Sequence, residues 1–180
     1  MKFSNDTPQI DKALKEFIEA NISLIENRDF KELYKKAYGM DIEYAIGTLT
    51  HVLYSIGIDP LEDLTYIPAG FFESCDALIE VEIPIHIEQI DESAFYDCNN
   101  IESITVPKNV IELGSWSLAG CDNLRKIVIL GDVKRIDRLA FGQLPKLDVI
   151  YCTQKTAELI ENTPELTEFK KLKFKIEVIR

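Results

Sequence analysis

Apolar positions recur in the middle of the chain with a fixed spacing, which is clearest at Cys75, Cys98 and Cys121, each 23 residues apart. Other columns keep this period over residues 64 to 152 without an insertion or deletion. Two of them are Val81, Ile104, Ile127 and Ile150, and Ile83, Val106, Ile129 and Cys152. A fixed period of about 20 to 29 residues with an L-x-x-L-x-L core is typical of a leucine-rich-repeat solenoid. The pattern therefore predicts four stacked repeats.

Alternation of apolar and polar residues within each repeat predicts one short strand, and stacking would align these strands into a parallel sheet. Residues between the apolar columns then point out of the solenoid. The outward set is Glu80, Glu82, Ser103, Thr105, Lys126, Val128, Val149 and Tyr151. We expect this strand face to be the main protein-binding site.

Residues 1 to 63 precede the repeats and are predicted to be helical. Apolar residues at helical spacing predict helices at residues 10 to 25, 30 to 37 and 42 to 56. A solenoid exposes an apolar edge at each end, so we interpret this segment as an N-terminal helical cap. A separate binding domain is the alternative.

Residues 153 to 180 follow the repeats and predict a C-terminal cap. Short helices are predicted at residues 156 to 162 and 164 to 171. The alternation at residues 172 to 179 predicts a fifth strand that closes the sheet. The predicted fold class is thus an α/β solenoid with a parallel β-sheet face, a helical cap at one end and a helix and strand cap at the other.

One segment resembles a known family. Residues 87 to 107 follow the pattern apolar-x-x-Ile-x-x-x-Ala-Phe-x-x-Cys-x-x-apolar-x-x-Ile-x-Val-Pro, which is similar to the BspA-type leucine-rich repeats. Gly114 keeps the family's usual glycine, whereas Asp91 and Asp137 replace it in the neighbouring repeats. Members of this family are typically recognition or adhesion modules, some on microbial surfaces and some encoded by bacteriophages. The resemblance therefore implies binding and carries over no catalytic residue.

The charge of the chain bears on its partners. It has 31 acidic residues against 20 lysines and arginines, a formal charge of −11. Such a charge argues against nonspecific binding to a phosphate backbone, which depends on lysine and arginine. Residues 64 to 109 hold nine acids and one lysine, whereas residues 110 to 152 hold five acids and six bases. The acidic repeats either steer a basic protein partner or serve solubility alone.

The sequence also indicates the cellular compartment in which we expect the protein. It contains no apolar stretch of the length that a membrane span needs, and its first residues lack the apolar core of a signal peptide. We therefore expect a cytoplasmic protein with reduced thiols, without direct contact with nucleic acid or a membrane. A monomer is the favoured oligomeric state.

Candidate catalytic and metal-binding residues are few. Equivalent cysteines in a solenoid form a line, whereas zinc needs four converging ligands, so we interpret the cysteine column as packing. Neither His51 nor His86 lies in a recognisable triad context. Glu80 and Glu82 would lie side by side on an open sheet and not across a pocket, which is poor geometry for acid and base catalysis. We expect no enzymatic activity, no metal and no cofactor.

Trp116 offers a secondary candidate site. It occupies a turn position where the other repeats carry Gly70, Ser93 and Leu139. Its indole either covers its own turn or forms, with Leu139, an exposed apolar patch of the kind found at interfaces.

These observations predict a non-enzymatic protein-protein interaction module that binds a basic protein partner through the strand face and the acidic N-terminal repeats. Two alternatives stay open at this point. One is a phage-encoded inhibitor that blocks a host protein with its acidic surface. The other is a relative of a microbial surface adhesin.

Overall fold

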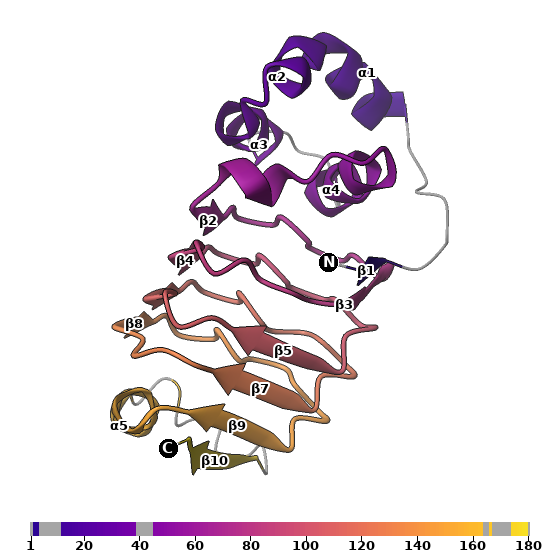
Figure 1. Ribbon diagram of the computed structural model, residues 1–180. Coiled ribbons are helices and arrows are strands. Elements are labelled where there is room, and N and C mark those ends of the chain that lie inside the picture. The colour runs from indigo at the N-terminus through magenta and orange to yellow at the C-terminus, as the bar shows by residue number, and fades with distance from the viewer. Residues whose placement is uncertain (1, 4–11, 39–44, 164–165, 167–173, 180) are drawn as a thin grey trace.

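The structure is a computed structural model that describes residues 2–3, 12–38, 45–163, 166 and 174–179. Helices lie at the N-terminal end and the repeats stack beneath them (Figure 1). The first predicted helix is divided in two at Asn21, and its predicted start lies outside the described residues. The helical elements are α1 (Lys12–Ala20), α2 (Ile22–Glu26), α3 (Phe30–Tyr38), α4 (Ala45–Ser55) and the 3-10 helix η1 (Pro60–Asp63).

Two parallel four-stranded sheets run along the solenoid. The larger sheet has the order β10-β9-β7-β5 and the smaller one, which was not predicted, the order β2-β4-β6-β8. Each strand pairs in register with the equivalent strand of the next repeat, so that Ser103 lies opposite Lys126. The strands are β5 (Ser103–Val106), β7 (Lys126–Ile129), β9 (Val149–Cys152) and β10 (Lys175–Val178), and β2 (Tyr66–Ile67), β4 (Gln89–Ile90), β6 (Glu112–Leu113) and β8 (Arg135–Ile136).

The repeats turn through two positions with left-handed backbone. The first column is Gly70, Ser93, Trp116 and Leu139, and the second is Ser74, Asp97, Gly120 and Gln143. Glycine adopts this conformation freely, whereas other residues are strained by it. Hydrogen bonds between successive turns hold it in place, for example from Phe72 N to Ala94 O at 2.8 Å and from Phe95 N to Ser117 O at 2.9 Å. Stacking therefore imposes the turn where the local sequence does not favour it.

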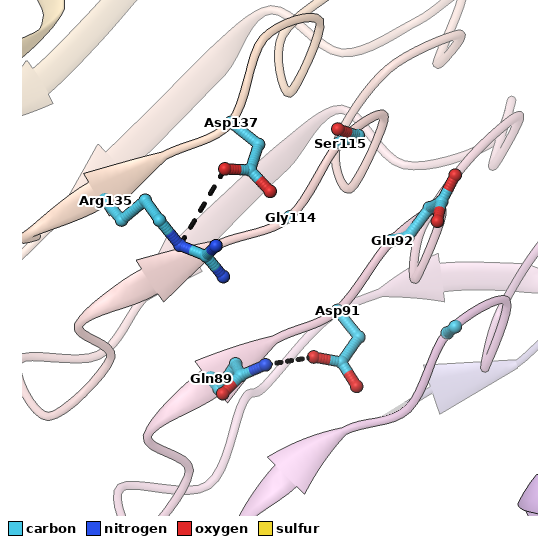
Figure 2. Close-up of a pocket in the computed structure, with 8 residues that line it drawn as sticks. Gln89, Asp91, Glu92, Gly114, Ser115, Arg135 and Asp137 are labelled. Carbon is cyan, nitrogen blue, oxygen red and sulfur yellow. Dashed lines mark hydrogen bonds and ion pairs between the residues drawn. The ribbon is translucent and has the colours of Figure 1, made fainter.

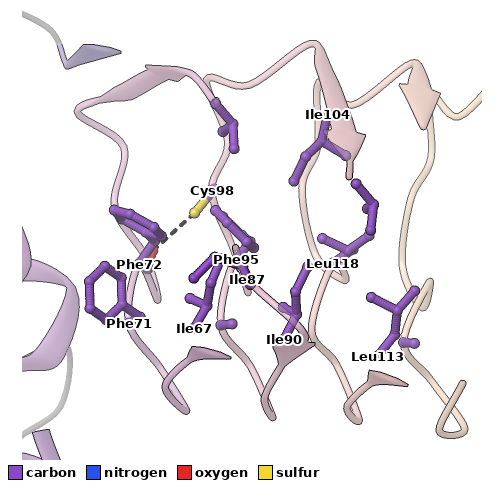
Figure 3. Close-up of a cluster of buried hydrophobic side chains, with 14 of the residues drawn as sticks. Ile67, Phe71, Phe72, Ile87, Ile90, Phe95, Cys98, Ile104, Leu113 and Leu118 are labelled. Carbon is purple, nitrogen blue, oxygen red and sulfur yellow. Dashed lines mark hydrogen bonds between the residues drawn. The ribbon is translucent and has the colours of Figure 1, made fainter. Parts of the chain in front are cut away.

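The apolar columns form a continuous core between the two sheets (Figure 3). Phe72 stacks on Phe95 of the next repeat, with ring centroids 5.0 Å apart. The cysteine column lies in this core, and two of its thiols bond back to the preceding repeat. Cys98 Sγ donates to Phe72 O at 2.9 Å, and Cys121 Sγ donates to Phe95 O at 3.1 Å. The cysteines are therefore part of the packing, as the sequence predicted.

The helices pack against the first repeat. Tyr34 of α3 contacts Phe71 with ring centroids 4.6 Å apart, and Tyr54 of α4 stacks on Phe72 at 6.3 Å. Arg28, between α2 and α3, forms a 2.6 Å ion pair with Asp63. These contacts place the helices at the N-terminal end of the solenoid, as predicted.

The strand predicted at residues 172 to 179 is present as β10, and it is the fourth strand of the larger sheet. Helix α5 (Gln154–Asn162) follows β9, and the Thr153 side chain caps it by accepting a hydrogen bond from Thr156 N. Strand β10 then pairs in parallel with β9, with Lys175 opposite Val149. The helix predicted at residues 164 to 171 lies almost entirely outside the described residues.

The strand predicted in the first repeat was wrong in its position and its pairing. We expected Val81 and Ile83 to lie on a strand of the main sheet, but the strand in this repeat is β3 (Leu78–Glu80). It pairs antiparallel with β1 (Lys2–Phe3) in a separate two-stranded sheet. Val81 is still buried, and Ile83 is partly buried. The apolar column thus persists in the first repeat although the strand does not.

Candidate protein-binding surface

Six of the eight predicted binding residues form two rows on the outward face of the larger sheet. One row runs across β5, β7 and β9, and the second runs parallel to it two residues further along each strand. Their side chains are exposed or partly exposed, while the residues between them are buried. Strand β10 adds one residue to each row, and neither of these residues was among the predicted binding residues. The rows are Ser103, Lys126, Val149 and Lys175, and Thr105, Val128, Tyr151 and Glu177.

The other two predicted residues lie at the N-terminal margin of this face. Glu80 is the last residue of β3, and Glu82 follows in a segment that is not a strand. Both are exposed. In the antiparallel pairing of β1 with β3, Lys2 lies opposite Glu80. The two glutamates are therefore accessible, but they flank the main sheet and do not lie on it.

A cleft occupies the space where β3 fails to join β5. Its volume is about 510 Å³, and Glu80 and Glu102 both line it. Two asparagine side chains connect the neighbouring repeats, one of them in the cleft lining and one outside it. Asn100 Nδ2 donates to Asp76 O at 2.7 Å, and Asn109 Nδ2 donates to Ile85 O at 2.8 Å. The lining residues are Ile79, Glu80, Val81, Asn100, Glu102, Ser103 and Thr105.

Charges differ between the two halves of the solenoid. Ion pairs join successive repeats in the C-terminal half, at Arg135–Glu112 (2.8 Å) and Lys155–Asp132 (2.7 Å). In the part of the chain that the structure describes, no lysine or arginine forms an ion pair with Glu102, which lines the cleft. The uneven charge of the sequence thus becomes an acidic margin at the cleft and a more balanced surface beyond it.

A second polar hollow, of about 310 Å³, lies over the smaller sheet (Figure 2). Gln89 donates a hydrogen bond to Asp91, and Arg135 lies between Glu112 and Asp137, with Nε 3.8 Å from Asp137 Oδ1. Partial burial raises the pKa of Asp91. This surface is not apparent from the sequence, because its strands are only two residues long.

The predicted secondary patch is packed more closely than the sequence alone indicated. The Trp116 indole meets the Tyr96 ring edge to face, with centroids 5.8 Å apart. A Cβ added at Gly142, in the next repeat, would lie 3.5 Å from the Trp116 ring. Both Trp116 and Leu139 are partly buried. The Trp116 indole therefore lies against the equivalent turn of the next repeat, and part of the indole remains exposed to solvent.

The thiols and the imidazole of His51 lie in surroundings that suit packing, whereas His86 is exposed. Burial raises the pKa of Cys75 to about 11 and that of Cys121 to about 12, so these thiols stay protonated at neutral pH. His86 Nε2 lies 2.8 Å from Leu61 O, and His51 is buried on α4. Among the described residues, no cluster of histidine, cysteine, aspartate or glutamate has the geometry to hold a metal ion.

Comparison with known proteins identifies the repeats. A family model described as a BspA type leucine rich repeat region, with six copies, matches residues 62–180. The chain belongs to this family. The match extends past the four predicted repeats and includes β10, which agrees with the pairing of β10 as a further strand of the stack.

Leucine-rich repeats are in general protein-binding modules and are typically non-enzymatic, and their stacked strands present an extended surface. A search of curated proteins and a search of solved structures returned no match. None of the helices that the structure describes is long and apolar enough to cross a membrane.

Proposed function

We propose that this protein is a non-enzymatic interaction module that binds a basic segment of a partner protein, with the cleft between β3 and β5 as its anchor. The observation that carries the proposal is the composition of that cleft, in which Glu80 and Glu102 lie beside Ile79. Ile79 is 39% exposed, so the cleft also presents apolar surface. The carboxylate of Glu102 next to an exposed apolar side chain suits a lysine or arginine that is flanked by an apolar residue.

The strand face supports the proposal by continuing from the cleft. Ser103 and Thr105 line the cleft and also begin the two outward rows. A partner segment anchored in the cleft would therefore extend over Lys126 and Val128 without leaving the sheet. Because the strands are fixed by ladder hydrogen bonds, this surface needs little reordering on binding, which favours affinity.

Charge supplies the second argument. An acidic surface attracts basic partners over a distance near the screening length, about 8 Å at physiological salt, and speeds their association. Complementary charge raises the rate and the specificity of binding more than it raises raw affinity. We therefore expect binding to weaken as salt rises.

The test begins with random peptides displayed on phage and selected on the wild-type protein at low salt. We expect selected peptides to be rich in lysine and arginine. Affinity for one such peptide is then measured by calorimetry with the Glu82→Lys/Glu102→Lys variant, which reverses Glu102 in the cleft and Glu82 at the margin of the strand face. This variant should lose roughly tenfold or more in affinity. The control, Glu158→Lys/Glu161→Lys, makes the same change in net charge on exposed positions of α5.

Two results would contradict the proposal. Selection of neutral or acidic peptides would show that the acidic margin does not direct binding. Equal losses in the two double variants would show that only net charge matters and that the cleft is not the anchor.

A further inference from the structure

The outer edge of β10 ends the larger sheet. Its inner edge is bound to β9, with Lys175 N donating to Asp148 O and Ile179 N donating to Cys152 O, both at 2.9 Å. In a parallel ladder alternate residues direct their backbone groups to the same neighbour. The N–H and C=O groups of Ile176 and Val178 therefore point away from β9. No strand of the described chain pairs with this outer edge.

Among the described residues, the edge of β10 carries no proline, no bulge and no charged side chain that points inward. Proteins block exposed edges with proline, with bulges or with charged side chains that point toward the core. On β10 the inward positions are Ile176 and Val178, which carry no charge. Val178 is 46% exposed, whereas Cys152, its partner on β9, is fully buried. The end of the sheet thus presents both open backbone groups and apolar surface.

The outward side chains of β10 make the edge complementary to itself. Lys175 and Glu177 lie on the same face, on either side of Ile176. If two β10 strands pair antiparallel about a two-fold axis at Ile176, each Lys175 lies opposite Glu177 of the other copy. Opposite charges at facing positions stabilise an antiparallel pair, and like charges destabilise it. A two-fold interface requires this kind of self-complementarity.

The charge of the whole molecule permits this arrangement. The chain carries a formal charge of −11, but the acidic repeats lie at the opposite end of the solenoid from β10 (Figure 1). Two copies that meet at β10 keep their acidic ends far apart. Salt at physiological strength screens the repulsion over that distance.

We infer that β10 pairs antiparallel with β10 of a second copy, in the register that places Lys175 opposite Glu177. The two four-stranded sheets then form one continuous sheet, and the two binding faces lie on one dimer. This inference is independent of the proposed partner and revises the expectation of a monomer. Because each β10 has only four residues, the dimer is expected to be weak and to form with rising protein concentration.

Sedimentation velocity across the micromolar range tests the inference on the full chain. The wild type should shift from monomer to dimer as concentration rises. Lys175→Glu and Glu177→Lys should each remain monomeric, because each places like charges at both facing pairs. The double variant Lys175→Glu/Glu177→Lys restores opposite charges and should dimerise as the wild type does. Lys126→Glu, an exposed charge reversal on β7, is the control and should dimerise normally.

Circular dichroism and thermal unfolding of each variant show whether it is folded, and the two single reversals serve as independent versions of the same test. A wild type that stays monomeric throughout would overturn the inference. Single reversals that dimerise like the wild type would also overturn it. A folded double variant that fails to dimerise would contradict the antiparallel register.

Discussion

Gly47 on α4 offers a sharp test of how the helices meet the repeats. A Cβ added at this position would lie 2.1 Å from Glu73 O, a backbone atom of the first repeat, and 3.1 Å from its carbonyl carbon. The carbonyl belongs to a turn that is fixed by a hydrogen bond from Glu73 N to Gly70 O at 2.9 Å. Gly47→Ala therefore requires α4 to retreat from the repeat by about 1 Å or more.

Two effects of opposite sign set the magnitude. Alanine stabilises the interior of a helix by about 1 kcal/mol relative to glycine. Forcing extra atoms into a packed contact costs about 1 to 3 kcal/mol, and here the contact is backbone that cannot rotate away. Retreat of α4 would also loosen the packing of Tyr54 on Phe72. The first two terms leave a net loss of about 0 to 2 kcal/mol in the free energy of unfolding, and the looser packing of Tyr54 adds to this loss.

Urea unfolding followed by two signals gives the measurement. Far-UV circular dichroism reports mainly the helices, while fluorescence of Trp116, the single tryptophan, reports the third repeat. In Gly47→Ala the dichroism transition should shift to lower urea, ahead of the fluorescence transition. Gly57→Ala is the matched control, because an added Cβ there meets nothing within 4 Å and adds only the strain of a φ of +82°.

An unchanged or higher stability of Gly47→Ala would refute this reasoning. It would show that α4 does not pack on the Glu73 carbonyl. Our proposal that residues 1 to 63 act as a cap depends on that contact, so the alternative of a separate domain would then be preferred.

Two further predictions concern the core and the hollow over the smaller sheet. Cys98→Ala should lower the free energy of unfolding by about 1 to 3 kcal/mol, because it removes buried volume and the bond to Phe72 O, and mass spectrometry should find no stoichiometric zinc in the wild type. Asp91→Asn should raise the melting temperature at pH 7, because burial raises the pKa of this carboxyl in the folded state and thus penalises its charged form. The folded state then binds the proton more tightly than the unfolded chain, so the wild type gains stability as pH falls through this raised pKa toward the ordinary value. Thermal unfolding of the variant and the wild type should therefore be compared from pH 7 down to below the ordinary aspartate pKa. The higher melting temperature of Asp91→Asn should disappear over this range, and a difference that stays constant with pH would contradict the raised pKa of Asp91.

The repeat was predictable because its signal is long and regular. Columns such as Val81, Ile104, Ile127 and Ile150 keep their spacing over four copies, so each copy supports the others. Strand β10 was predicted from its apolar and polar alternation, and it pairs with β9 with Ile176 opposite Ile150. The two outward rows followed directly, because side chains alternate across a strand.

Features that depend on distant contacts were not predictable. Strand β3 ends at Glu80 and pairs with β1, and a two-residue strand near the N-terminus leaves no pattern to read. The cleft lies between β3 and β5, which do not pair, so its lining could not be assembled from the sequence. The smaller sheet was also not predicted, because strands of two residues cannot show alternation. Its apolar column, which includes Ile67 and Ile90, was visible without its strands.

The most direct test of the central claim is to locate a bound basic peptide by NMR. Amide shifts of the isotope-labelled protein are followed during titration with a peptide selected on the wild type. We predict that the largest changes fall on the cleft and the start of the strand rows, at Glu80, Glu102, Ser103 and Thr105. Changes centred instead on Gln89, Asp91 and Arg135, over the smaller sheet, would contradict the assignment of the binding site.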